Sequence, residues 1–336
     1  MGALTNRYVT LQKETTYGTE PTASTAGQFT GEVDDESFAQ NFDLLTRADI
    51  GHYGARKTTD GLRFSEGSMN CPLQLDDFNG FLIANAFGVD TFDSGVEPDT
   101  HTLTETTDDS TFQSFCVRVG REDKEHTYCG MVLDSLSLSA NINEYVMMSY
   151  NMVGCGESAV SSLQTLGGGG TNAPGFSTED ALHFARAFVR FEDVASSSNF
   201  SAMVKSISID INLNRDADNA SSLGNATYAV APPPTLREIT GTIEFNRDVS
   251  SASDNEPTYE ELRDFLKHEG GDSFATPALS IHLEDTAATP NSLTLKLANV
   301  AYEAPEMNVS GRDTSTMSVS FVALYDVGSS GMAQCI

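Results

Sequence analysis

The sequence predicts a mainly β protein made of two tandem antiparallel β-sandwich or half-barrel domains, each with one short α-helix. Three observations lead to this fold class. The same order of elements occurs twice along the 336 residues, the closing segments of each half alternate apolar and polar residues with period two, and a glycine-rich stretch separates the halves. Helical patterns are too scarce for a parallel α/β fold.

Each half opens with two extended segments. The first segments are RYVTLQKE (7–14) and AFVRFED (187–193). The second are DESFAQNFDLLTR (35–47) and KSISIDINLNR (205–215), which both end in an arginine and precede a long polar loop. The shared order indicates that one unit is present twice.

A strand introduced by glycine and a short helix come next in each half. The strands are GSMNCPLQL (67–75) and GTIEFN (241–246). In the first helix Asp76 or Asp77 can cap the free backbone amides. Apolar residues then follow at i, i+3 and i+4 before a terminating glycine: Phe78, Phe81, Leu82 and Gly88.

The second helix repeats this pattern after an inserted VSSASDNEP segment. Thr258 and Glu261 form a capping box at its start. The apolar residues and the glycines that end the helix are Leu262, Phe265, Leu266, Gly270 and Gly271. The two helices are therefore interchangeable in pattern.

Strands with one buried face close each half. SFCVRV (114–119) corresponds to ALSIHL (278–283). In the following strand the apolar positions Met131, Leu133, Leu136 and Leu138 correspond to Leu295, Leu297, Val300 and Tyr302. In the last strand Val146, Met148 and Tyr150 correspond to Met317, Val319 and Phe321.

These elements divide the chain into five parts, with LGGGGTNAPGF (166–176) as the flexible connection between the halves. The parts are an N-terminal arm (1–27), a first β domain (28–160), a glycine-rich linker (161–182), a second β domain (183–328) and a C-terminal tail (329–336).

The chain is strongly acidic, with 48 Asp and Glu against 19 Lys and Arg and a formal net charge of −29. Such a surface repels nucleic acid. Molar salt shortens the range of charge repulsion to about 3 Å, so this composition suits a halophilic source. The alternative is an ordinary acidic protein whose charge keeps it soluble.

No residue pattern indicates catalysis, a cofactor or a metal. The histidines are far apart, and there is no nucleophile elbow, phosphate-binding loop or C-x-x-C pair. A tight hairpin around Glu122 and Asp123 would place Cys116 opposite Cys129, either bonded or as a reduced neighbouring pair. We therefore expect a protein that is not an enzyme.

Nothing in the sequence indicates export or membrane insertion. Residues 1–27 lack an apolar core of signal-peptide length, and no stretch approaches the 18 apolar residues needed to span a bilayer. We expect the protein to be made and assembled in the cytoplasm.

The few cations cluster near the start of the chain and in the first long loop. This clustering suggests a contact with an acidic surface of a neighbouring subunit. A chance run in a mobile loop is the alternative. The candidate contact residues are Arg7, Lys13, Arg47, Arg56, Lys57 and Arg63.

The opening RYVTLQKETTYGTEP (7–21) resembles the start of many tail tube proteins, the major tail proteins of long-tailed viruses of the siphovirus type. The unit that follows is similar to the tube-protein fold, and it occurs twice. The chain thus resembles a duplicated, two-domain tail tube protein, and its acidity points to a haloarchaeal virus.

The resemblance implies a structural virion protein that forms stacked rings around an acidic lumen, through which viral DNA passes into the host without specific binding. Two fused domains imply trimeric rings of pseudo-sixfold symmetry, with hexameric rings as the alternative. Loops 47–66 and 215–239 and the arm 1–27 would make the contacts between rings. Further partners would be the tape measure, terminator and distal tail proteins.

A capsid decoration or adhesin-type β-sandwich is the alternative from a different class. It would need a receptor-facing patch or an export signal, and the sequence shows neither. An enzyme would need a catalytic constellation, which is also missing.

Overall fold

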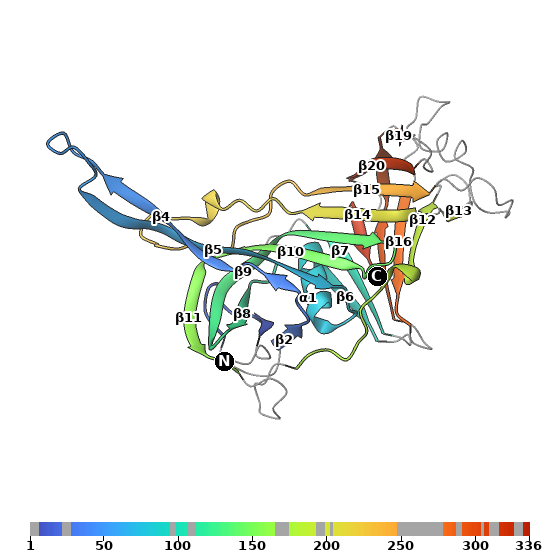
Figure 1. Cartoon of the computed structure of the whole chain (residues 1–336), viewed down its shortest axis with the longest axis horizontal. Coiled ribbons are helices and arrows are strands. Elements are labelled where there is room, and N and C mark those ends of the chain that lie inside the picture. The colour runs from blue at the N-terminus through green and yellow to red at the C-terminus, as the bar shows by residue number, and fades with distance from the viewer. Residues whose placement is uncertain are drawn as a thin grey trace.

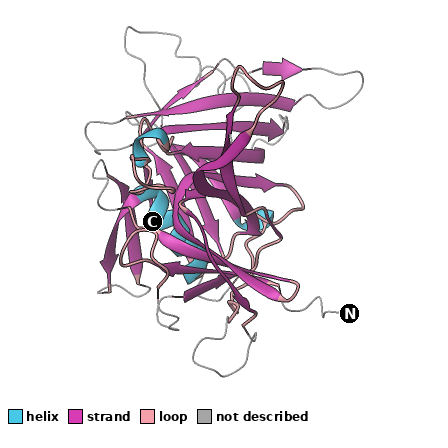
Figure 2. Ribbon diagram, turned by 90° about the vertical axis from the view of Figure 1, so that its left-hand side faces the viewer, coloured by secondary structure: helices cyan, strands magenta, loops and turns pink. Residues whose placement is uncertain are grey.

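The computed structural model (Figure 1) gives the fold of most of the chain. It describes residues 7–21, 28–94, 99–106, 112–164, 175–192, 199–201, 204–246, 278–286, 291–303, 306–308, 316–325 and 332–336. Strands predominate over helices (Figure 2), and all pairs of named strands are antiparallel, so the predicted mainly β fold class is confirmed.

The described part of the first half contains eleven strands and one α-helix. They are β1 (Tyr8–Lys13), β2 (Gln28–Gly31), β3 (Asp35–Glu36), β4 (Ala39–Arg47), β5 (Lys57–Pro72), α1 (Asp77–Phe87), β6 (Gly88–Asp93), β7 (Thr100–Glu105), β8 (Phe115–Arg121), β9 (Lys124–Asn141), β10 (Met147–Gly154) and β11 (Gly156–Ser162).

The described part of the second half contains strands and two short 3₁₀ helices, Phe184–Arg186 and Asp218–Ala220. The strands are β12 (Ala187–Glu192), β13 (Asn199–Ser201), β14 (Val204–Asn212), β15 (Glu238–Asn246), β16 (Ala278–Glu284), β17 (Ser292–Leu297), β18 (Asn299–Tyr302), β19 (Glu306–Asn308), β20 (Thr316–Leu324) and β21 (Ala333–Cys335). The predicted second helix lies outside the described residues.

One large sheet runs through both halves in the order β18-β20-β15-β14-β9-β10-β5-β3. Strand β9 of the first half pairs directly with β14 of the second half. The apolar residues that the sequence placed in alternate positions lie in the core, among them Leu136, Leu138, Ile209 and Ile211. The two halves therefore share one continuous sheet.

A smaller sheet also joins the halves, in the order β13-β12-β16-β17-β21-β7-β6. Strand β21 lies between β17 of the second half and β7 of the first half. Residues 329–336 were predicted as a tail, but Ala333–Cys335 form this inserted strand, and the Cys335 side chain is buried. The run is too short for periodicity to reveal a strand.

The strand pairings of the two halves follow the same order. β1 pairs with β2 and β8, as β12 pairs with β13 and β16. β8-β9-β11 is matched by β16-β17-β21. β9-β10-β5-β4 is matched by β18-β20-β15-β14.

Helix α1 confirms the first predicted helix. The Asp76 side chain accepts a hydrogen bond from the backbone N–H of Asn79 and caps the helix, and Gly88 ends it with a positive φ of 100°. Phe78 and Leu82 are buried in the core. The helix thereby covers the core side of the sheet in the first half.

Strand β1 ties part of the predicted N-terminal arm (1–27) to the first half. It pairs with β8 along its whole length, from Tyr8 to Lys13. Val9 and Leu11 are buried. This part of the arm is therefore a core strand of the first half.

A long hairpin replaces the predicted polar loop 47–66. Strands β4 and β5 pair as far as Arg47 opposite Lys57 and project away from the body of the molecule (Figure 1). The residues of the part that projects are exposed on both faces of the hairpin. Because neither face is buried, the sequence there shows no alternation of apolar and polar residues that would have predicted strands. We call residues 42–63 the projecting hairpin.

The long segment between β14 and β15 returns along the first half. Arg215 donates from Nε to the backbone carbonyl of Leu133 at 2.9 Å, and its guanidinium lies over the Phe112 ring. Arg237 forms a nearly buried ion pair with Glu105 at 3.1 Å. These contacts fix the second half against the first.

Candidate assembly surfaces

The large sheet turns a continuous polar face away from the core. One row of paired residues crosses seven strands of this face and spans both halves of the chain. The row consists of Asp35, Asn70, Ser149, Ser137, Asp210, Thr240 and Val322. All members of this row except Val322 are polar. One neighbouring row adds Ser68, Asn151, Ser135, Asn212 and Glu238, and the other adds Ser139, Ser208, Thr242 and Ser320 beside Met147 and Pro72.

Short side chains bond to one another across the strands of this polar face. Asn70 donates to Asp35 at 2.8 Å, and Ser137 donates to Asp210 at 2.5 Å across the junction of the halves. Similar bonds join Asn151 to Ser135 and Asn41 to Glu66. These bonds tie polar side chains of neighbouring strands to one another.

Carboxylates dominate the charge of the polar face. They are Asp35, Glu66, Asp210, Glu238 and Glu244. Among the described residues of the face, one cation contacts them: Lys205 lies 2.9 Å from Glu244. The face therefore presents net negative charge to whatever lies in front of it.

The projecting hairpin is the second candidate surface, because it exposes large apolar side chains. Leu44 and Leu45 are 56% and 61% exposed, and Ile50 and Tyr53 at the tip are fully exposed. An isolated subunit gains nothing from exposing such groups in one protruding element. The pattern is typical of a surface that another chain covers.

The structure brings four of the six predicted contact residues together on this hairpin. Arg47 and Lys57 face each other across the strands, and Arg56 at the tip donates its backbone N–H to the carbonyl of Arg47. Arg63 pairs with Asp60 at 2.9 Å. The cations therefore lie beside the exposed apolar residues.

The other two predicted contact residues lie in the body. Arg7 directly precedes β1, and Lys13 ends it. The Lys13 ammonium lies 5.1 Å from the centre of the Phe81 ring. These two residues do not share a surface with the hairpin tip.

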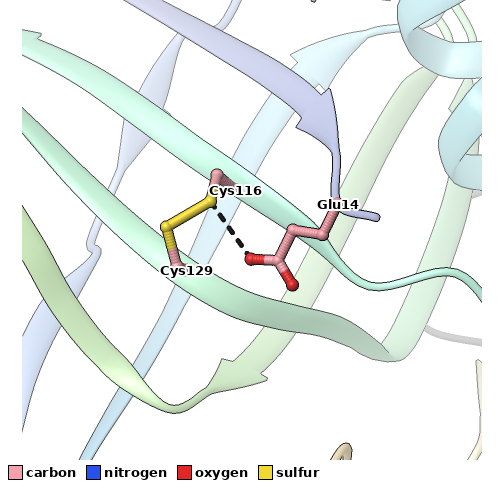
Figure 3. Close-up of side chains that lie close together, drawn as sticks. All are labelled: Glu14, Cys116 and Cys129. Atoms are coloured by element: carbon pink, nitrogen blue, oxygen red, sulfur yellow. Dashed lines mark hydrogen bonds between the residues drawn. A yellow bond between two sulfur atoms is a disulfide. The ribbon is translucent and has the colours of Figure 1, made fainter. Parts of the chain in front are cut away.

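A buried cluster in the first half joins Glu14 to a cysteine pair (Figure 3). Cys116 and Cys129 form a disulfide, and the Cys116 sulfur lies 3.1 Å from a carboxylate oxygen of Glu14. Burial raises the pKa of Glu14, and hydrogen bonds from Gly130, Ser114 and Gly18 oppose this shift. The reduced alternative for the pair is thus not the observed state, and the bonded sulfurs are not thiolate ligands for a metal.

Sequence reasoning missed the polar face, although its signal was present. In LDSLSLSAN (133–141) the apolar residues were assigned to the core. The intervening serines follow the same period of two and must share the opposite face. The hairpin's apolar residues carried no such periodic signal.

The described part of the chain has no helix with the length and apolar character that crossing a bilayer requires. None of the curated proteins matches the chain in sequence. The family model for the phage tail tube protein matches residues 5–323, which is nearly the whole chain and includes both halves. With its antiparallel β architecture, the chain therefore belongs to the phage tail tube protein family, a family of structural proteins of the virion tail.

Proposed function

We propose that this chain forms rings that stack into a tail tube, with the polar face lining the lumen. The polar face carries this proposal, because it continues across both halves and its residues are exposed or half-buried where the structure describes the chain. The projecting hairpin extends from the same sheet and would reach the adjacent ring. Arg47, Arg56, Lys57 and Arg63 would then meet acidic surface there.

A wall of small hydroxyl and amide groups with net negative charge suits the passage of DNA. Phosphates that approach the wall meet carboxylates such as Asp210 and Glu66 and are repelled. The DNA therefore slides without binding. Delivery of the viral genome into the host through this lumen is the function that follows.

Reversing charge on the polar face should make the tube retain DNA. We expect Asp210→Lys tubes to bind short duplex DNA at least about tenfold more tightly than wild-type tubes, with affinity falling steeply as salt rises. Filter binding at several salt concentrations measures this. Asp123→Lys makes the same charge change on the exposed β8–β9 turn and should leave DNA binding unaltered. Equal binding by both variants would place the lumen elsewhere.

The matching pairing order of the halves supports an internal duplication. The domain boundaries predicted from the sequence would then change in two places. Strand β1 would move from the N-terminal arm to the first domain, and β21 would move from the C-terminal tail to the second domain. Three chains would supply six copies to a ring with a true threefold axis and an approximate sixfold axis. The tape measure, terminator and distal tail proteins would meet the tube within the tail.

Cryo-electron microscopy of assembled tubes in cross-section tests this arrangement. We expect six lobes of two alternating kinds around a central lumen. A ring of six chains, with one half of each chain outside the ring, would exclude the trimer and leave the tube intact. Discrete monomers under all conditions would exclude the tube.

The acidity of the chain supports a virus of a salt-loving host. Assembly of the tail in the host cytoplasm is part of the same proposal. With a net charge of −29, repulsion within and between subunits should weaken assemblies in dilute buffer. We expect the melting temperature and the tube yield to rise from about 0.1 M to about 2 M KCl. Circular dichroism and sedimentation across this series measure both, and a flat response would contradict the halophilic origin.

A further inference from the structure

The Cys116–Cys129 disulfide is buried, so a reagent in solution cannot touch it directly. Cys116 and Cys129 are 0% and 1% exposed, and the Glu14 carboxylate lies against the Cys116 sulfur (Figure 3). Thiol–disulfide exchange requires an attacking sulfur to contact a sulfur of the disulfide. A small thiol or disulfide therefore needs an intermediary, unless the strands around the bond open.

A third cysteine lies beside this disulfide. The backbone N–H of Cys155 donates to the carbonyl oxygen of Cys129 at 3.1 Å, and the Cys155 thiol donates to the same oxygen at 3.0 Å. The next residue, Gly156, is the strand partner of Cys129. Hydrogen-bonded residues of neighbouring strands have Cα atoms about 5.5 Å apart, a separation that a disulfide can span. Unlike the bonded pair, Cys155 is only half-buried.

Two glycines leave the space that the Cys155 sulfur occupies. Gly18 and Gly130 both have a φ of 67°, and a Cβ atom added to them would lie 2.9 and 2.7 Å from this sulfur. Both glycines also donate their backbone N–H to the Glu14 carboxylate, at 2.9 and 2.6 Å. Glu14 and Gly18 belong to the K-E-x-x-Y-G-T run (13–19). This run therefore holds the third thiol against the strand that carries Cys129.

We propose that Cys155 is the exchange thiol through which small disulfides form, and small dithiols reduce, the buried Cys116–Cys129 bond. Disulfides are rare in proteins made in a reducing cytoplasm. An exchange thiol would let the folded chain gain or lose this bond without unfolding. The role of Cys155 does not depend on the assembly of rings.

Reduction then takes two exchanges. The Cys155 thiolate attacks the Cys129 sulfur, and the Cys116 sulfur leaves with the electron pair of the broken bond. A dithiol attacks the Cys155 sulfur next, the Cys129 sulfur leaves, and the second sulfur of the dithiol closes a cyclic disulfide and releases Cys155. The dithiol is oxidised, and its two protons end on Cys116 and Cys129. Oxidation reverses these steps, with a small disulfide as the electron acceptor that leaves as two thiols.

Glu14 is placed to pass the proton of the first exchange from Cys155 to Cys116. Its carboxylate lies 3.1 Å from the Cys116 sulfur. Burial and the charge of Glu14 raise the pKa of the Cys155 thiol to about 11, and burial also raises the pKa of Glu14. Little of the Cys155 thiol is ionised at neutral pH, so the exchange is slow and the formed bond is protected.

Single cysteine replacements in the full chain test which sulfurs can meet. Cys116→Ser leaves Cys129 beside Cys155, and we expect oxidised glutathione to join them in a 129–155 link that peptide mass spectrometry identifies. Cys129→Ser is the matched control, because it leaves Cys116 and Cys155 on either side of β9, about 10 Å apart. That variant should stop at a glutathione adduct of Cys155, with at least about tenfold less internal link.

The rate of reduction in the folded protein tests the role of Cys155 itself. Dithiothreitol should reduce the Cys116–Cys129 bond at least about tenfold more slowly in Cys155→Ser than in the wild type. Alkylation and mass spectrometry count the new thiols. Cys71→Ser removes another free cysteine but keeps a group that can donate to Asn79, so it should match the wild-type rate. Circular dichroism should give these variants the wild-type spectrum.

Three results would overturn the role of Cys155. Equal rates in the wild type and Cys155→Ser would mean that the bond is reached by opening of the strands. A folded Cys116→Ser variant without a 129–155 link would mean that the two sulfurs do not meet. A bond that dithiothreitol does not reduce in the folded wild type would mean that no exchange route exists.

Discussion

Replacing Leu44 and Leu45 with aspartate should abolish tube formation and leave a folded subunit. Both side chains are more than half exposed on the projecting hairpin, outside the core. The free energy of unfolding of the subunit should therefore change little. Every contact between rings, in contrast, would have to bury two charges without partners. We expect the yield of sedimentable tubes to fall at least about tenfold, because a loss of about 1.4 kcal/mol per contact already has this effect.

The same hairpin offers a matched control. Thr46→Asp/Thr59→Asp adds two carboxylates to the hairpin without removing an apolar side chain, and it should reduce tube yield far less. Circular dichroism should give all three proteins the same spectrum and similar melting temperatures. Normal tubes from the leucine variant would show that the hairpin does not join rings.

Removing residues 1–13 should unfold the first half of the chain. Tyr8, Val9 and Leu11 are buried in β1, and each large apolar side chain contributes about 2 kcal/mol. The loss of about 6 kcal/mol, before the β1–β8 hydrogen bonds are counted, is comparable to the total stability of many domains. We expect loss of the cooperative thermal transition and rapid proteolysis.

Removing residues 1–6 provides the comparison, since it stops short of β1. That truncation should melt at the wild-type temperature. A stable, protease-resistant protein lacking residues 1–13 would mean that β1 is dispensable and that this strand can serve as a free arm between rings.

The elements that could be predicted best from the sequence are those in which local side-chain chemistry and the burial pattern indicate the same secondary structure. Asp76 followed by Phe78 and Leu82 predicted α1, because a capping side chain and an apolar stripe both act within a few residues. The strands around Leu136, Leu138 and Tyr150 were predictable because one face is buried and the other polar.

Other parts of the fold depend on partners that the sequence does not identify. The strands of the projecting hairpin are exposed on both faces, so Thr58 and Thr59 were assigned to a loop. The pairing of β9 with β14 joins segments far apart in the chain, and alternation in each segment is compatible with many partners. The Cys116–Cys129 spacing permitted a bond without requiring one.

Strand β21 also constrains the order of events during synthesis. It lies between β7 and β17, yet it leaves the ribosome after both of them. At translation rates of about 5 to 20 residues per second, β7 waits on the order of ten seconds or longer for this neighbour. The smaller sheet therefore cannot close before Cys335 has been made, whereas the β9–β14 pairing that joins the halves in the large sheet needs only residues up to Asn212.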